Sequence, residues 1–341
     1  MRALVKYAPG KGNVGVREMP VREPEADELL IKVKYCGICG TDLHIYLGHM
    51  DKRVTMPQII GHEMSGIIAE IGAGVTGWQI GDRVVVRPLA PCGNCPACRA
   101  GHSHICYNLK FLGIDTPGAL QESWTVPAYT LHHIPDHLPL DKAALIEPLA
   151  VACHDVRLGD IQPGEYVVVI GGGPIGTLVA LVAQQAGANV LISEVSPFRV
   201  NLAREIGLDA VNPKETDLVA LVNERTGGAG ADVVFEVSGS AAGAAVMTDL
   251  VRTRGRIVIV AIFAQAPPVN LHRFFWRELH LCGARVYEPE DFEQAIDLAA
   301  RSVLPLDRLI SAKEPLANLG AVFQQIETNP TLMKVLIKTG E

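Results

Sequence analysis

The second half of the chain alternates apolar runs of strand length with stretches of helical length, and this alternation constrains the fold most strongly. The strand-length runs are Tyr166–Ile170, Asn189–Ser193, Ala231–Val237 and Arg256–Ile262. The helical stretches are Ile175–Ala186, Pro197–Ile206, Asp217–Arg225 and Ala241–Leu250. Strands joined by helical crossovers lie parallel, and helices then cover both faces of their sheet. The pattern predicts an α/β unit with a doubly wound parallel sheet.

A glycine-rich turn joins the first strand of this unit to its first helix. The sequence GGGPIG at 171–176 matches the pattern G-x-G-x-x-G in a strand–turn–helix setting. Glycines let the backbone approach a pyrophosphate, which binds at the N-terminus of the helix. The predicted cofactor contacts are Gly171, Gly173, Pro174, Ile175 and Gly176. A second match, GAGVTG at 72–77, leads into a turn without a helix and is predicted to be a loop.

The strand that follows the glycine-rich helix ends at Glu194, eighteen residues after Gly176. A carboxylate at this position accepts hydrogen bonds from the adenosine ribose hydroxyls and repels a 2′-phosphate. This residue favours NAD over NADP. Arg199, five residues later, is a second candidate contact with the adenosine and weakens that preference.

Four cysteines form a closely spaced C-x2-C-x2-C-x7-C group in a chain that has only eight cysteines. They are Cys92, Cys95, Cys98 and Cys106. Disulfides between such near neighbours would close strained loops, whereas four thiolates can converge on one tetrahedral ion. Soft thiolate sets bind zinc or an iron–sulfur cluster. Because Tyr107 follows the last cysteine where bacterial ferredoxins have proline, zinc is favoured.

A second set of metal-ligand types lies in CGICGTDLH at 36–44 and in GHE at 61–63. Cys39, His62 and Glu63 supply a thiolate, an imidazole and a carboxylate, which suit a catalytic zinc site with one open position. Cys36 and Cys39 alone would also fit a redox dithiol. However, Cys36 ends an alternating strand and is predicted to pack as a small apolar residue.

The N-terminal part is predicted to be rich in β-strands. Candidate strands are Leu29–Tyr35, Ser65–Ile71, Arg83–Val86, Leu120–Val126 and Thr130–Ile134, and a helix is expected at Leu145–Leu158. After Asp291 two helical segments and the strand Leu332–Lys338 are too little for a domain. This tail is expected to pack back on the N-terminal part.

Composition excludes several classes of function. A net charge of −7 leaves no basic surface for a nucleic-acid partner, and no apolar run is long enough to span a membrane. The start of the chain has no apolar run of the signal-peptide type, and the cysteines outside the four-cysteine group are expected to be free thiols. We therefore expect a cytoplasmic protein.

Taken together, these motifs resemble the zinc-dependent medium-chain alcohol dehydrogenases over essentially the whole chain. GHE at 61–63 with Glu147-Pro148 is similar to the polyol branch, which includes sorbitol, butanediol and threonine dehydrogenases. The resemblance implies a GroES-like β-rich catalytic domain at 1–147 and 290–341, with a structural zinc lobe at about 88–110. It implies a NAD-binding Rossmann domain at 148–289.

The resemblance also implies the roles of individual residues and two zinc ions per chain. Cys39 and His62 would bind the catalytic zinc, Glu63 would be the third ligand, and Glu147 would bind directly or through the water on the ion. Asp42 would hydrogen-bond the far nitrogen of His62. The four-cysteine group would hold a closed structural zinc. Thr41 and His44 would relay the alcohol proton, and the pocket would include Tyr46, Phe111 and Arg285.

The activity implied is hydride transfer from a small secondary alcohol or polyol to NAD, which gives a ketone. Threonine 3-dehydrogenase-like and 2,3-butanediol dehydrogenase-like activities stay open within that class. A zinc-independent quinone or enoyl reductase would not need Cys39, His62 and Glu63. A metal-stabilised binding module would need more positive charge than the zinc lobe offers. The family forms dimers or tetramers through a sheet edge, here Ile257–Ile262 with Leu279–Gly283.

Overall fold

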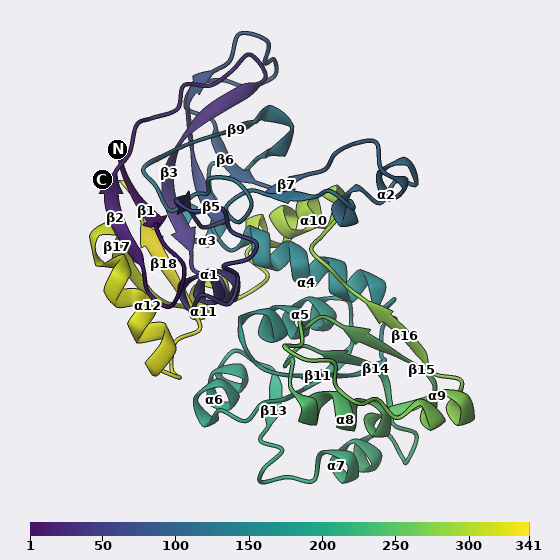
Figure 1. Ribbon diagram of the computed structural model, residues 1–341. Helices are drawn as coiled ribbons and strands as arrows, with labels where there is room; N and C mark the ends of the chain where they lie inside the picture. Colours follow the sequence, from purple (N-terminus) through teal and green to yellow (C-terminus); the bar gives the residue numbers. More distant parts are fainter. Residues whose placement is uncertain (341) are drawn as a thin grey trace. The chain divides into compact units, whose positions relative to one another are not determined.

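The chain divides at Glu147 and at Tyr287 into two units in a computed structural model, which describes residues 1–340 (Figure 1). One unit combines Met1–Glu147 with the segment from Glu288 onwards, and the other is Pro148–Tyr287. The family resemblance implied a second boundary two residues later, between 289 and 290. The first unit is therefore made of two chain segments, and the second is continuous.

A seven-stranded sheet organises the discontinuous unit. Its strands in order are β10 (Leu131–His133), β6 (Arg83–Val86), β5 (Glu63–Ile71), β3 (Glu28–Gly37), β18 (Lys334–Lys338) and β17 (Ile310–Pro315), with β9 (Ser123–Pro127) also paired to β3. Smaller sheets join β2 (Val14–Glu18), β1 (Arg2–Lys6) and β4 (Gln58–Ile59), and β7 (Leu89–Ala90) with β8 (Lys110–Phe111). Because β18 pairs with β3, the C-terminal segment packs on the N-terminal part as expected.

Short helices connect the strands of this unit. They are α1 (Gly40–Tyr46), α2 (Pro96–Arg99), α3 (Leu140–Ala143), α10 (Pro289–Ala300), α11 (Leu306–Leu309) and α12 (Leu319–Thr328), with 3-10 turns at Ser103–Ile105, Ala128–Thr130 and Leu316–Asn318. Trp124 is buried in the core, and its indole N–H donates to the carbonyl of Pro117 at 2.9 Å. The GAGVTG segment at 72–77 is a loop after β5, as predicted.

The continuous unit contains a six-stranded parallel sheet. The strand order is β13 (Asp209–Val211), β12 (Asn189–Ser193), β11 (Tyr166–Ile170), β14 (Ala231–Glu236), β15 (Val251–Ile259) and β16 (His280–Gly283). Its helices are α5 (Pro174–Gln185), α6 (Pro197–Glu205), α7 (Leu218–Arg225), α8 (Ala241–Leu250) and α9 (Leu271–Arg277), and α4 (Ile146–Leu158) crosses the unit boundary. All pairings are parallel, so the predicted doubly wound fold is confirmed.

One strand prediction in this unit had inaccurate bounds, and one strand, β13, was not predicted. The strand predicted at Arg256–Ile262 begins five residues earlier and ends at Ile259. It ends there because the next two backbone N–H groups, of Val260 and Ala261, both donate to the carbonyl of Glu236, which turns the chain away. Ile262 then lies 94% exposed. β13 was missed because three residues before a proline are too few to show a pattern.

Candidate metal centre and nucleotide-binding site

The register of three antiparallel strands brings the predicted metal ligands together. Gly37, the last residue of β3, lies opposite Glu63 of β5 on one side and opposite Leu336 of β18 on the other. Cys39 follows Gly37 by two residues, and His62 immediately precedes Glu63. As a result the Cys39 sulfur, one nitrogen of His62 and one oxygen of Glu63 all lie within 4.8 Å of one another. These donors fit a zinc ion with room for a further ligand.

The charges around His62 favour a cation at this point. Burial alone lowers the pKa of His62, but the negative charges of Cys39 and Asp42 outweigh this effect, and Glu147 adds to them. Together they raise the pKa of His62 to about 10. The side chains therefore form a buried negative field around the imidazole, which a bound metal ion would neutralise.

Asp42, which lies near the candidate ligand His62, is fully buried. Its Oδ2 accepts a hydrogen bond from the backbone N–H of Cys39 at 2.9 Å, which fixes the start of α1. Its Oδ1 lies 3.9 Å from His62 Nδ1, and neither of these two atoms has a hydrogen-bond partner. The predicted hydrogen bond is not formed at this distance, although the two groups still attract each other as charges.

Lys334 forms a buried ion pair with Glu63 that the sequence motifs did not reveal. Its Nζ donates to both carboxylate oxygens, at 2.7 and 2.6 Å, and to the carbonyl of Ile38 at 3.2 Å. The side chains of Lys334 and Glu63 are only 4% and 1% exposed. Burial lowers the pKa of Lys334, but the charge of Glu63 raises it above its usual value. The sequence signal for this ion pair was a lysine at the start of an apolar strand, β18, where a buried cation needs an acidic partner.

Glycine is required opposite this pair. A Cβ atom added to Gly37 would lie 2.3 Å from Glu63 Oε2. The carboxylate therefore occupies the space above the glycine, and its position is fixed by packing as well as by the lysine.

The other predicted residues of this unit lie in different surroundings. Glu147 is buried and close enough to raise the pKa of both His62 and Lys334, but it is outside the 4.8 Å group. Phe111 is buried and packs its ring edge against His62, with centroids 5.1 Å apart. Thr41 is partly buried near the start of α1.

Two predicted pocket residues and the predicted relay histidine differ sharply in exposure. Tyr46 is buried and stacks on Phe323, with ring centroids 5.0 Å apart. His44 is exposed in the last turn of α1. Arg285 is exposed and lies in the other unit, two residues after β16.

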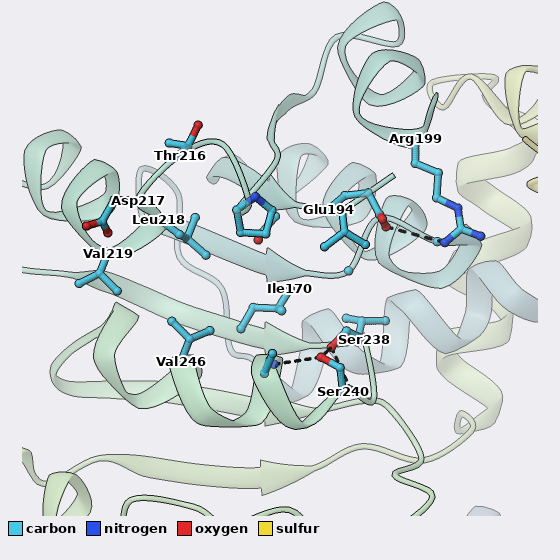
Figure 2. Close-up of a pocket in the computed structure, with 18 residues that line it drawn as sticks. Ile170, Glu194, Arg199, Thr216, Asp217, Leu218, Val219, Ser238, Ser240 and Val246 are labelled. Atoms are coloured by element: carbon cyan, nitrogen blue, oxygen red, sulfur yellow. Dashed lines mark hydrogen bonds and ion pairs between the residues drawn. The ribbon is translucent and has the colours of Figure 1, made fainter. Parts of the chain in front are cut away.

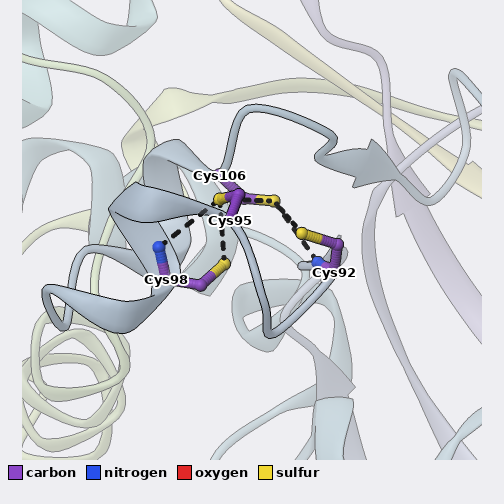
Figure 3. A group of neighbouring side chains, drawn as sticks. All are labelled: Cys92, Cys95, Cys98 and Cys106. Carbon is purple, nitrogen blue, oxygen red and sulfur yellow. Dashed lines mark hydrogen bonds between the residues drawn. The ribbon is translucent and has the colours of Figure 1, made fainter.

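The four-cysteine group forms a compact thiol cluster around α2 (Figure 3). Neighbouring sulfur atoms lie 3.4 to 3.8 Å apart, close to the edge of about 3.8 Å in a tetrahedron with zinc–sulfur bonds of about 2.3 Å. Backbone N–H groups of Cys92, Cys98, Tyr107 and Asn108 donate to these sulfurs. Such donors stabilise thiolates. The backbone N–H of Asn94, followed by the Cys106 thiol and the side-chain amide of Asn108, lowers the pKa of Cys92 to about 6. The donor set fits a closed four-thiolate zinc.

A cavity of about 800 Å³ lies at the carboxyl ends of the strands in the continuous unit (Figure 2). Its apolar lining includes Ile170, Leu218, Val219 and Val246. Glu194 and Arg199 lie at one end of the view, and Thr216 and Asp217 lie at the other. An apolar slot with a carboxylate at one end fits a flat base and its ribose.

The glycine-rich turn has the geometry that close backbone approach requires. Gly171 has a φ of +106°, which favours glycine, and a Cβ atom on Gly176 would lie 1.9 Å from the carbonyl oxygen of Gly171. Gly171 and Gly173 both line the cavity. The first helical turn of α5 can therefore pack directly against the turn, as dinucleotide binding needs.

Both oxygens of Glu194 are already held by the backbone. Oε2 accepts from the N–H of Gly172 and Oε1 accepts from the N–H of Ser196, each at 2.7 Å. Arg199 Nη1 lies 3.8 Å from Oε2, so the cavity end carries one acid and one base. The backbone bonds fix the carboxylate in place and leave its remaining lone pairs available to ribose hydroxyls.

Comparison with known proteins identifies the family. The chain matches the model of the alcohol dehydrogenase GroES-like domain at residues 25–136 and that of the zinc-binding dehydrogenases at 174–301. The chain therefore belongs to the zinc-dependent medium-chain alcohol and polyol dehydrogenases, a family of oxidoreductases that use zinc and a nicotinamide cofactor.

Several characterised or solved relatives are similar over nearly the whole chain. A 2-dehydro-3-deoxy-L-galactonate 5-dehydrogenase of Pseudoalteromonas atlantica is 54% identical over 329 residues, which is 96% of each chain. A sorbitol dehydrogenase of Halalkalibacterium halodurans is 37% identical over 343 residues, which is 99% of this chain and 99% of the relative. A zinc-binding dehydrogenase structure from Sinorhizobium meliloti 1021, bound to NADP, has 33% identity and a TM-score of 0.92. The match covers 99% of this chain and 98% of the chain in that structure.

No helix within residues 1–340 is long and apolar enough to cross a membrane.

We expect the loss of Lys334 alone to destabilise the metal-free protein, because Glu63 would stay buried without its partner. Lys334→Met leaves a buried carboxylate without its partner and should lower the free energy of unfolding by about 3–5 kcal/mol. The measurement is the urea midpoint, with a chelator present so that metal binding does not contribute. The double variant Lys334→Met/Glu63→Leu removes both charges and should recover most of the loss. A single variant as stable as the double variant would contradict the pairing.

Proposed function

We propose that the protein oxidises a secondary hydroxyl group of a small polyhydroxy compound with NAD as the hydride acceptor. The observation that carries the proposal is the convergence of Cys39, His62 and Glu63 within 4.8 Å, in a chain whose other unit contains a dinucleotide cavity. Cys39 and His62 would hold a catalytic zinc together with Glu63 or Glu147. The four cysteines at 92–106 would hold a second, structural zinc.

The residues of the metal centre prepare the site for an alcohol. A zinc ion bound there supplies Lewis acidity, which lowers the pKa of a substrate hydroxyl group. Lys334 holds Glu63, and Asp42 adds a negative charge beside His62, so the ligand residues are set before substrate arrives. The buried ring of Phe111 beside His62 supplies an apolar wall that keeps water away from the imidazole. Thr41 and His44 would take the substrate proton toward solvent.

A sugar acid is the favoured substrate class. The relative with 54% identity acts on 2-dehydro-3-deoxy-L-galactonate, which carries both a carboxylate and secondary hydroxyl groups. A polyol is the second candidate, because the sorbitol dehydrogenase relative matches the whole chain. L-threonine 3-dehydrogenases also match, over 88 to 90% of the chain. Arg285 and Tyr46 stay sequence-based predictions of substrate contacts, with Arg285 the candidate partner of a carboxylate.

The substrate and the catalytic metal are tested in one assay. Wild-type protein should reduce NAD fastest with 2-dehydro-3-deoxy-L-galactonate in a panel that also contains sorbitol, 2,3-butanediol, L-threonine and simple alcohols. Cys39→Ala should lower kcat/KM by a factor of at least about 10³, because the ion contributes several kcal/mol. Its zinc content should fall from two ions per chain to one.

The control for the metal centre is Cys153→Ala, which removes a buried thiol of the other unit and should keep both ions and full activity. Retained turnover in Cys39→Ala would refute the proposed mechanism. A faster reaction with sorbitol than with the sugar acid would assign the chain to the polyol class.

We propose NAD as the physiological cofactor because Glu194 is fixed at the ribose end of the cavity. A negative charge there repels a 2′-phosphate, while Arg199 attracts one. Glu194→Ser should raise the ratio of kcat/KM for NADP to that for NAD by roughly 10- to 100-fold, or about 1.4–2.8 kcal/mol. Asp217→Ser, which changes another acid of the same cavity, should leave the ratio unchanged. A wild-type preference for NADP would show that Arg199 determines the choice.

We also propose that the protein is a homo-oligomer, a dimer or tetramer, in which β16 pairs with its copy. β16 is the last strand of its sheet, and Leu281 within it is 48% exposed. The neighbouring helix α9 exposes Leu271, Phe275 and Trp276 by 71 to 77%. An exposed strand edge beside an apolar patch is a typical self-association surface.

We propose a cytoplasmic location for the protein, because its free thiols suit a reducing compartment.

Light scattering tests the assembly. The wild-type mass should correspond to at least two chains, and Trp276→Glu should shift it toward the 36.6 kDa monomer. Ile80→Glu introduces the same charge at a residue of the other unit that is 70% exposed, and it should not change the mass. A monomeric wild type would contradict the proposed interface.

A further inference from the structure

A second histidine lies against the predicted relay histidine. The Nδ1 atoms of His44 and His49 are 3.1 Å apart, and the ring centroids are 5.4 Å apart at an interplanar angle of 41°. Two imidazole nitrogens at this distance must share a proton, so one ring donates through Nδ1 and the other accepts. The Nε2 atom of each ring stays available to another partner.

His49 is held in this position by its backbone and by the loop around it. Its N–H donates to the carbonyl of His44 at 3.0 Å. Gly48, with a φ of +81°, turns the chain at the end of α1, and a Cβ atom there would lie 3.0 Å from the Cα of Gly10. Asp51 then accepts a hydrogen bond from the N–H of Gly10 at 2.6 Å. These contacts attach the loop to the N-terminal segment, and together with the backbone hydrogen bond to His44 they hold His49 facing His44.

Two charged side chains of the same loop, Asp51 and Arg53, are engaged with other groups. Asp51 Oδ2 binds the backbone of Gly10, and the guanidinium of Arg53 forms two hydrogen bonds with Asp115, at 2.9 and 2.8 Å. The nearest proton acceptor that the geometry offers to His44 on its Nδ1 side is therefore His49.

We infer that His49 is the outer base of the proton relay, which orients His44 and receives its proton. This inference rests on the proposed function, since it extends the path that begins at Thr41. Thr41 and His44 are three residues apart in α1 and therefore share a face of that helix. His49 acts through His44 and is a positioning and proton-accepting residue.

The transfer balances as a simple proton hop. In the resting pair His44 carries its proton on Nδ1 and donates it to His49 Nδ1, so His44 Nε2 is free to accept a proton from the substrate side. When that proton arrives, the Nδ1 proton passes to His49, and His49 releases its own Nε2 proton to water. Both rings are then neutral again, and exchange with solvent restores the original tautomers. No electron moves in this step.

The tautomer of His44 gives a test that does not depend on turnover. In protein with ¹⁵N-labelled histidine, NMR should find His44 protonated on Nδ1 in the wild type. His49→Phe should shift His44 to the Nε2–H form, because its Nδ1 acceptor is gone. An unchanged His44 tautomer in this variant would overturn the inference, whatever substrate the enzyme uses.

Kinetics test the proton transfer itself. His49→Gln can still hydrogen-bond His44 but cannot pass a proton on, so kcat for alcohol oxidation should fall about 5- to 50-fold in both His49 variants, with KM values within about twofold. The solvent deuterium isotope effect on kcat should rise, and added imidazole should restore most of the rate of His49→Phe. His133→Gln, an exposed histidine of the same unit that stacks on Trp78, should behave as wild type.

The outcomes separate the inference from the proposed function. Wild-type rates and isotope effects in both His49 variants would overturn the relay while leaving the dehydrogenase activity intact. A rate loss that imidazole does not rescue, with raised KM or a lower melting temperature, would make His49 merely structural and also overturn it. A wild-type protein that oxidises nothing in the panel would refute the proposed function, and the NMR result would still decide whether His49 orients His44.

Discussion

The antiparallel register of β3 with β5 and β18 is the constraint on which the candidate metal centre depends. Because Gly37 lies opposite both Glu63 and Leu336, residues far apart in sequence meet just beyond the end of β3. A shift of one residue in either pairing would turn the side chains of that strand to the opposite face of the sheet. Apolar side chains buried along these strands, such as Leu30 and Ile337, therefore fix the position of the ligands as firmly as any bond at the site itself.

The site concentrates charge where the fold excludes water, and its packing shows how that charge is tolerated. Glu63 has Lys334 as a direct partner, whereas Asp42 has a backbone N–H and the more distant ring of His62. A buried acid next to an imidazole leaves a negative field that a divalent ion can neutralise. The thiol cluster at 92–106 solves the same problem differently, with backbone N–H groups directed at sulfur. At the candidate catalytic site a charged side chain compensates the buried carboxylate, whereas in the four-cysteine group backbone N–H groups compensate the charge on sulfur.

Local patterns predicted the parallel unit well. Its buried strands appear in the sequence as continuous apolar runs, and its tight turn before α5 can be made only with glycine. The four cysteines were equally clear, since their spacing alone determines their convergence. Lys334 was not foreseen because its partner lies 271 residues away, and only the β3–β18 register brings them together. The same holds for Tyr46, whose ring is buried against Phe323 of α12. Long-range packing leaves no local signature, so the partners of Lys334 and Tyr46 could not be predicted from the sequence.

The division of the β-rich unit into two chain segments sets an order for its assembly during synthesis. The nucleotide-binding unit, Pro148–Tyr287, is continuous and leaves the ribosome before β17 and β18. Domains generally fold as units as they emerge. A nascent chain can therefore complete the dinucleotide cavity while Glu63 still lacks Lys334 and β3 still has an open edge. The candidate catalytic centre is therefore the last site of the molecule to be finished, after the dinucleotide cavity and after synthesis of the four-cysteine segment at 92–106.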